Sequence, residues 1–108
     1  MDITLVGWTE EEQTVARVAF EQAYTRAVAG LIAAIKLQAV ELAGAEAVWQ
    51  LHDFISIQRH VIEGRFDFRF EGLLFTFASL IKEGLLQPEE LQGLDAEKLG
   101  KITAMARF

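Results

Sequence analysis

The sequence predicts an all-α protein in which a long helical stalk, able to form a hairpin, dimerises and carries a small C-terminal helical head. Apolar residues recur at spacings of three and four along most of the 108 residues, which is the period of an amphipathic helix. Proline occurs once and no linker or low-complexity run divides the chain, so we expect a single domain over residues 1–108. The chain is 52% hydrophobic, and a chain this small buries only part of its apolar surface alone, so some of that surface should meet another chain.

The first stalk helix should begin near Glu10 and run to Leu42. Thr9 followed by Glu12 has the spacing of a capping box, in which the hydroxyl and the carboxylate each accept a backbone N–H at a helix start. A seam of apolar side chains continues along the helix, formed by Phe20, Ala23, Ala27, Val28, Leu31, Ala34, Ile35 and Leu42. A helix of about 33 residues is a rod of roughly 50 Å, longer than a compact domain of this size is wide. Part of the rod should therefore pack against a partner.

The second stalk helix should follow a break at Gly44 and end at about Glu63, with Gly64 in the left-handed conformation just after its end. The stalk then covers about residues 9–64. Its two helices can fold back as an αα-hairpin or run nearly in line, and the sequence leaves both arrangements open.

Trp49 lies on the polar face of this second helix, in the stretch WQLHDFISIQRH. At about 100° per residue, the side chains within roughly 80° of Trp49 are His52, Asp53, Ser56, Arg59 and His60. The opposite side, the expected core face, carries Val48, Leu51, Phe54, Ile55, Val61 and Ile62. A large aromatic therefore lies among charges, on the face that a soluble helix normally gives to water.

The head should cover about residues 66–108 and begin with RFDFRF, whose alternation resembles a strand. One isolated short strand has nothing to pair with, so we predict a turn and then a third helix from about Phe68 to Glu83. Its apolar stripe consists of Phe70, Leu73, Leu74, Phe77, Leu80 and Ile81. Phe75 lies away from this stripe, and it is a second aromatic on a polar face.

Gly84 should end the third helix, and Pro88 suits the first position of a short helix that follows. Asp95 can cap a last helix from Ala96 to about Arg107. In that last helix we expect Leu99 and Ile102 to face inward, and Lys98 and Lys101 to face outward.

Composition and motifs argue against several function classes. The net charge of −6 and the pI near 4.8 argue against nucleic acid as a partner, because phosphate binding relies on clustered Lys and Arg. The chain has no cysteine, and His52 and His60 are too far apart along one helix to share an ion, so we expect no metal site. Its glycines form no phosphate-binding pattern, so we expect no cofactor. The opening MDITLVGWTEEE lacks the features of a signal peptide, which favours a cytoplasmic protein.

Catalysis is a weak interpretation of the polar face. His52 and Ser56 are an i, i+4 pair with Asp53 nearby, but a working nucleophile needs an orienting group and an oxyanion hole from other segments. We therefore expect no enzyme. A solvated face with salt links explains Asp53 and Arg59 but not Trp49. A protein-binding surface explains both, since Trp and Arg dominate interface hot spots. Phe75 fits this interpretation more weakly, because single exposed apolar residues are common.

The chain resembles the cyanobacterial fluorescence recovery protein family over nearly its whole length. The residues that carry the resemblance are Trp8 with TEEEQ behind it, the run WQLHDF followed by Arg59 and His60, and LLF in the third helix. The chain departs from the family pattern at Phe66, Phe68 and Phe70, where the resemblance leads us to expect mostly tyrosines.

The resemblance implies a homodimer that is not an enzyme and whose partner is the orange carotenoid protein. That partner opens in strong light to a red form that binds phycobilisomes and dissipates their energy. The family member would bind the photoactivated form, speed its return to orange, help to detach it from the phycobilisome and so restore fluorescence. The implied partner-binding residues are Trp49, His52, Asp53 and Arg59, with Phe75 and Lys101 as a second contact on the head.

A generic dimeric helical adaptor with an unrelated partner, bound through the Trp49, Asp53 and Arg59 face, remains the alternative. In either case we expect the dimer interface to include Val48, Leu31, Ile35 and Leu51, which lie on the apolar faces of the two stalk helices. A peripheral association with the phycobilisome-bound complex, near the cytoplasmic face of the thylakoids, would come through the partner.

Overall fold

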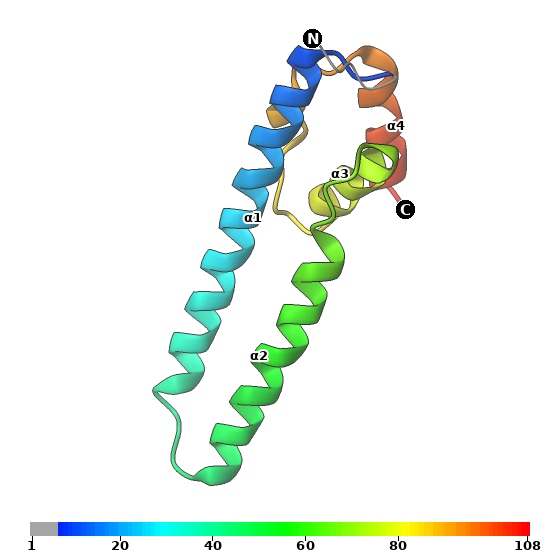
Figure 1. Ribbon diagram of the computed structural model, residues 1–108. Helices are drawn as coiled ribbons and strands as arrows, with labels where there is room; N and C mark the ends of the chain where they lie inside the picture. The colour runs from blue at the N-terminus through cyan, green and yellow to red at the C-terminus, as the bar shows by residue number, and fades with distance from the viewer. Residues whose placement is uncertain (1–6) are drawn as a thin grey trace.

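The computed structural model describes residues 7–108, and this part of the chain is helical without a β-strand. Helices α1 (Glu10–Ala39) and α2 (Ala45–Arg65) form an antiparallel hairpin, which decides between the two arrangements that the sequence left open (Figure 1). The head follows at the open end of the hairpin, with η1 (Phe70–Gly72), α3 (Leu73–Lys82), η2 (Pro88–Leu91) and α4 (Ala96–Ala106). The all-α prediction is confirmed. Residues 1–6, in which we expected no signal peptide, lie outside the described part.

The molecule is elongated, with principal extents of 56 × 33 × 17 Å and a radius of gyration of 17.2 Å. A compact domain of about 100 residues has a radius of gyration of about 13 Å. Buried side chains gather at the head end, and α2 has no buried residue at all. The far half of the stalk therefore has no sealed core of its own within one chain.

The local signals at the start of α1 are confirmed. Thr9 Oγ1 accepts from the backbone N–H of Glu12 at 3.1 Å, and the Glu12 carboxylate accepts from the Thr9 N–H at 3.0 Å. The expected end at Leu42 is wrong, since α1 stops at Ala39. The chain needs residues 40–44 to reverse direction, and Gly44 is the extended residue that precedes α2.

Gly64 does not end the second helix as we expected. Helix α2 continues through Arg65, and Gly64 has no positive φ. The Phe66 N–H still bonds to Ile62 O at 2.9 Å, so the last turn closes without a left-handed residue. A glycine near the end of a pattern is an ambiguous stop signal, because one glycine inside a helix is tolerated at modest cost.

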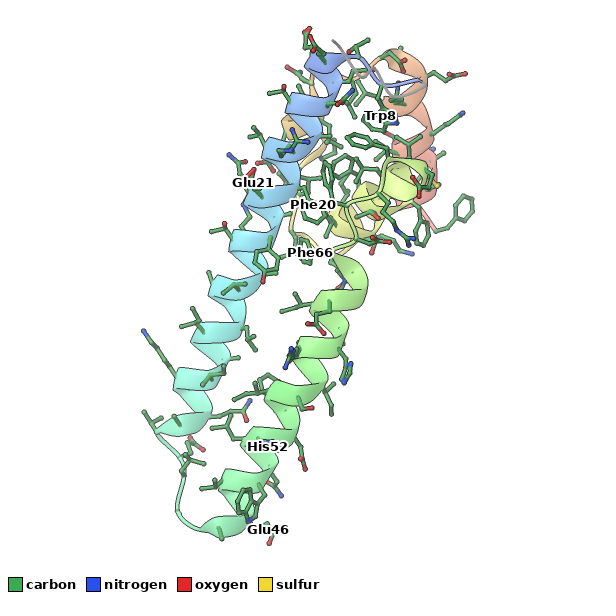
Figure 2. All side chains as sticks on the ribbon, viewed as in Figure 1. Trp8, Phe20, Glu21, Glu46, His52 and Phe66 are labelled. Atoms are coloured by element: carbon green, nitrogen blue, oxygen red, sulfur yellow. The ribbon has the colours of Figure 1, made fainter. Side chains whose placement is uncertain are left out.

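The alternating aromatics after α2 form an extended segment that packs along α1. In an extended chain alternate side chains share a side. Six rings make one edge-to-face series with centroid separations between 5.0 and 5.4 Å, in the order Tyr24, Phe66, Phe20, Phe68, Phe70 and Trp8. Figure 2 shows Phe20 and Phe66 together at the junction of stalk and head. The intervening Asp67 and Arg69 pair with each other, with Arg69 Nε 2.9 Å from Asp67 Oδ1. The third helix consequently begins at Leu73 rather than near Phe68.

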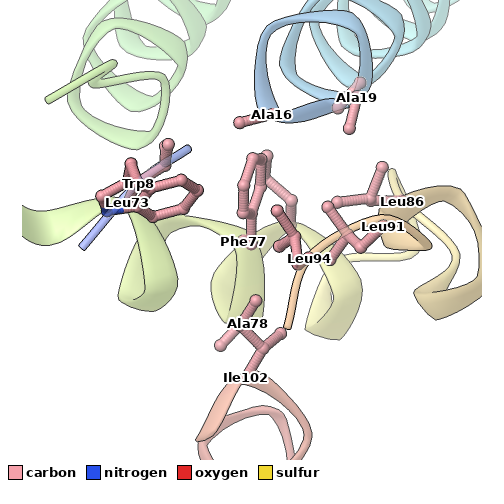
Figure 3. Packing of buried hydrophobic residues seen from close by; sticks show 12 residues of the cluster. Trp8, Ala16, Ala19, Leu73, Phe77, Ala78, Leu86, Leu91, Leu94 and Ile102 are labelled. Atoms are coloured by element: carbon pink, nitrogen blue, oxygen red, sulfur yellow. The ribbon is translucent and has the colours of Figure 1, made fainter. Parts of the chain in front are cut away.

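The core of the head is built around α3, which packs large side chains against the small ones of α1 on one side and against α4 on the other (Figure 3). Phe77 and Leu80 of α3 are fully buried, and Ile102 of α4 packs beside Ala78 (Figure 3). From α1 the buried apolar side chains are the alanines Ala16, Ala19 and Ala23. The α3 stripe predicted from the sequence is confirmed, since each of its members is buried or packs against the core.

The boundaries of the head follow the predicted signals. Gly84 has a φ of 77° just after α3, Pro88 opens η2, and the Asp95 side chain accepts from the Lys98 N–H at 2.8 Å at the start of α4. One expectation is wrong. Lys98 does not face outward, because its side chain is only 12% exposed and lies against α1.

Candidate functional site

The stalk face, which we define as Trp49, His52, Asp53 and Arg59 on α2, is exposed throughout. Trp49 is 64% exposed, and the apolar side of α2 faces α1 instead. His52 Nδ1 lies 3.3 Å from Asp53 Oδ1, and Arg59 Nε lies 3.3 Å from Glu63 Oε2. Exposed ion pairs of this kind contribute about 0.2–1 kcal/mol, so they hold the side chains only loosely. A partner's groups can replace them at small cost.

The stalk face comes from one helix alone, which limits what chemistry it can do. A nucleophile with its base, orienting group and oxyanion donors needs several segments to converge. Here α1 lies on the opposite side of α2, and no other element covers Trp49. Among residues 7–108, no three His, Asp or Glu side chains come together as metal ligands. The stalk face is therefore suited to binding a partner through surface contacts.

Phe75 and Lys101 are both exposed, and both belong to the head. Phe75 is 69% exposed on α3, and Lys101 is exposed on α4. The structure does not bring them to the stalk face, because Trp49 lies in the second turn of α2, toward the closed end of the hairpin (Figure 1). Figure 2 shows the same separation between His52 and the aromatic residues near the head. The six implied partner-binding residues therefore form two regions of one long molecule.

The four expected dimer residues do not share one environment. Val48 is 43% exposed, whereas Leu31, Ile35 and Leu51 are half-buried. Leu31 lines a groove of about 330 Å³ between α1 and α2, and Leu51 lines a hollow near the closed end of the hairpin. Of these four positions, Val48 offers the most apolar surface that the hairpin leaves uncovered. Large apolar side chains also remain exposed on α1, including Tyr24, Ile32 and Leu37, and Val40 is exposed just after it.

A buried ionic cluster at the top of α1 was not predicted. Lys98 Nζ lies 3.2 Å from both carboxylate oxygens of Glu12 and 4.9 Å from the centre of the Trp8 ring. Burial raises the pKa of the Glu12 carboxyl, but hydrogen bonds from the backbone of Thr9 and Asp95 and from Lys98 outweigh it, so the pKa lies below its ordinary value. Burial lowers the pKa of Lys98, but its bonds to Glu12 and Asp95 outweigh burial, so the pKa lies above its ordinary value. Both groups are therefore charged at neutral pH.

This cluster could not be predicted from local patterns, because Glu12 and Lys98 are 86 positions apart. A helical wheel places Lys98 only within its own helix. The one available signal was the capping box, which fixes where the Glu12 carboxylate points.

None of the helices in the described part is both long enough and apolar enough to cross a membrane.

A helical fold whose distinctive side chains lie on exposed faces, as in residues 7–108, is typical of small helical proteins that bind a partner through their surface. Residues 8–106 match the family model described as photoprotection regulator fluorescence recovery protein. The chain therefore belongs to the fluorescence recovery protein family. It is 44% identical over 101 residues to the fluorescence recovery protein of Synechocystis sp., covering 94% of this chain and 93% of that protein.

Solved structures agree with this assignment. The structure of the Fremyella diplosiphon fluorescence recovery protein aligns with a TM-score of 0.89 at 44% identity, covering 94% of this chain and 99% of that one. The Synechocystis structure aligns with the same TM-score, identity and coverage. The predicted family is confirmed, and with it a role in regulating photoprotection.

Proposed function

We propose that this protein binds the photoactivated red form of the orange carotenoid protein, accelerates its return to the orange form and helps to detach it from phycobilisomes. The supporting observation is Trp49, 64% exposed between charged side chains on a helix face that the hairpin does not cover. This face carries Trp49, His52 and Asp53 of the WQLHDF run on which the family resemblance rests. The return to the orange form and the detachment restore antenna fluorescence. The protein acts in the cytoplasm, at the thylakoid surface only through its partner, and without catalysing a covalent reaction.

To accelerate the partner's return to the orange form, the two exposed regions must bind the different states of the partner with different affinities. The protein must bind the state in which the partner's domains reapproach more tightly than it binds the open state. It must also release the closed orange product, and a binder with equal affinity for every state would shift nothing. The two exposed regions provide a means. The stalk face can hold one domain while Phe75 and Lys101 hold the other, which raises the effective concentration of the two domains for each other.

The head contact has its own test. We expect the double substitution Phe75→Ala and Lys101→Ala to slow recovery while the helical circular dichroism spectrum stays the same, since both side chains are exposed. If the double variant bound and accelerated like the parent, the head would not be a contact.

The stalk face is tested by Arg59→Leu, with Lys36→Leu as a matched control. Both residues are exposed stalk cations, and Lys36 lies on α1 outside the stalk face. Binding to the illuminated red form and to the dark orange form is measured by size-exclusion chromatography. We expect the parent and Lys36→Leu to retain the red form preferentially, and Arg59→Leu to lose most of this binding. Equal retention by all three proteins would remove the stalk face from the proposal.

We also propose that the protein acts as a homodimer whose interface includes Val48, Leu31, Ile35 and Leu51. Helix α2 has no buried residue in one chain, and α1 exposes apolar side chains beyond those that α2 covers. A helix that is apolar on several sides is normally buried on several sides. A second stalk supplies the missing cover, because its own apolar faces are equally exposed.

A further inference from the structure

The connection between α3 and α4 forms a strap, residues 85–95, that rises beside the N-terminal half of α1 (Figure 1). Charged groups tie it to α1 at both ends. At the lower end Arg26 donates to Leu85 O at 3.0 Å and pairs with both oxygens of Glu90 at 2.7 and 2.6 Å. At the upper end Glu12 Oε2 accepts from the Asp95 N–H at 2.8 Å. The two ties are fourteen residues apart along α1, about 21 Å of helix.

Between the ties the strap fits closely on α1. A Cβ built on Gly93 would lie 2.7 Å from Val15 Cγ2. The φ of Gly93 is 116°, a conformation that residues with side chains rarely adopt. Glycine therefore lets the backbone of the strap lie directly against α1 at this position. Leu86, Leu91 and Leu94 of the strap are buried. They meet the alanine face of α1, which offers little side-chain surface to hold them (Figure 3). The polar ties therefore add to the packing of the three buried leucines at the two ends of the strap.

The Glu12 carboxylate divides its two oxygens between two helices. Oε1 accepts from the Thr9 N–H and completes the cap of α1, while Oε2 accepts from the Asp95 N–H at the start of α4. Lys98 Nζ bridges both oxygens at 3.2 Å and also reaches Asp95 Oδ2 at 3.2 Å. The charged groups that face Glu12 from α4 are thus Lys98 and Asp95. One side chain links the first turn of the stalk to the first turn of the last helix.

We propose that the Glu12 carboxylate is a pin that locks the strap and α4 onto the stalk, and that losing its negative charge releases the head as one body. Within the head α3 packs chiefly on α4, and the same core also includes Ala16, Ala19 and Ala23 of α1. The segment 66–69 is then the connection about which the head moves. Release would change the separation between Trp49 on the stalk and Phe75 on the head. This last consequence rests on the proposed function; the pin itself does not.

The test uses Glu12→Gln in the full chain, with Glu11→Gln as the matched control. Glutamine at position 12 can still accept from the Thr9 N–H, because capping boxes use Gln as well as Glu. It cannot supply a second acceptor for Asp95 or a charge for Lys98. Glu11 is exposed in the same helical turn, so its substitution makes the same change of charge without touching the strap.

Amide hydrogen exchange measures the release. We expect Glu12→Gln to raise exchange at least about tenfold in the strap and the first turn of α4, leaving α2 and the middle of α3 unchanged, because local opening exposes only the freed segments. Glu11→Gln should match the parent. A uniform rise over α1, α2 and α4 would mean general destabilisation, and no rise in the strap would mean that Glu12 is not the pin. Either result overturns the proposal.

A distance measurement then shows whether the head moves as a body. The chain has no cysteine, so Glu46→Cys and Ala104→Cys place spin labels at exposed sites on the stalk and on α4 without further changes. Dilution with unlabelled protein suppresses distances between chains. We expect one narrow distance in the parent and in Glu11→Gln, and a longer or broader one in Glu12→Gln. An unchanged narrow distance contradicts release. No partner is present, so failure here leaves the proposed function intact.

Discussion

Glu12 shows how one residue can determine a pH dependence. The pKa values of Glu12, Glu90 and Asp95 all lie below their ordinary values, and hydrogen bonds made in the folded state contribute to each of these shifts. An unfolded chain therefore binds more protons than the folded one in the range just below those ordinary values. Stability gained in this way is fully present above the ordinary pKa and is lost as pH falls through the folded pKa.

We expect the free energy of unfolding to fall as the pH drops below 4.5, the ordinary pKa of the Glu12 carboxyl. The fall should be shallower in Glu12→Gln, which has no carboxyl to protonate at that position. Urea unfolding followed by circular dichroism across this range measures both proteins at one concentration. Identical slopes in the two proteins would show that the Glu12 carboxyl titrates alike in the folded and unfolded chains.

Phe77 and Phe75 provide a matched pair on one helix. Phe77 is fully buried and Phe75 is 69% exposed, two positions apart on α3. We expect Phe77→Ala to cost about 3–5 kcal/mol of stability through lost burial and the cavity left behind. Phe75→Ala should stay within about 0.5 kcal/mol of the parent, as is usual at exposed positions. Chemical denaturation of the two variants checks both values, and equal losses would contradict the assigned burial.

Local chemistry predicted individual residues well where the responsible neighbours are close in sequence. The Thr9 and Glu12 cap, the end of α3 at Gly84 and the Asp95 cap all depend on contacts within a few positions. Lys98 was misplaced because its partner Glu12 is distant in sequence, and a helical wheel contains no information about another helix. The exposure of Trp49 was predictable, since it depends only on the period of α2.

Among the elements, a substitution at Gly64 tests whether α2 ends before this residue or continues through it. Nothing lies within 4 Å of a Cβ built at Gly64, which is inside the helix. We therefore expect Gly64→Ala to stabilise the protein by about 0.5–1 kcal/mol, the usual gain in a helix interior. A left-handed residue after the helix would give the opposite result. Gly84→Ala is the control and should destabilise, because φ is 77° there.

The elements were predicted in type and order, but several of their boundaries were not. Helix α1 is shorter than expected because the chain must reverse before α2, and periodicity says nothing about where a reversal is needed. The RFDFRF segment is neither a paired strand nor the start of a helix. Its rings find their partners on α1, and this packing overrides the local pattern. An alternating sequence pattern shows which side chains share a side, but it does not identify the surface against which they pack.

At the scale of the whole molecule, the stalk leaves more apolar surface exposed than one chain can use. Val48 is 43% exposed at the start of α2, and we expect Val48→Glu to dissociate the proposed dimer. A charge placed in a dry interface without a partner costs several kcal/mol. Sedimentation should show a monomer for this variant and a dimer for Gln50→Glu, which adds the same charge nearby at an exposed polar position. An unchanged dimer in Val48→Glu would place the interface elsewhere.

Two exposed regions at different places on one elongated molecule suit a protein that brings two domains of a partner together. We propose that this protein accelerates closure of the photoactivated orange carotenoid protein. The direct measurement is the dark recovery of that protein's orange absorbance after illumination, with and without an equimolar amount of the dimer. We expect recovery several-fold faster with the protein present, since the protein should bind the closing state more tightly than the open one. Recovery at the same rate with and without the protein would show that it does not accelerate closure.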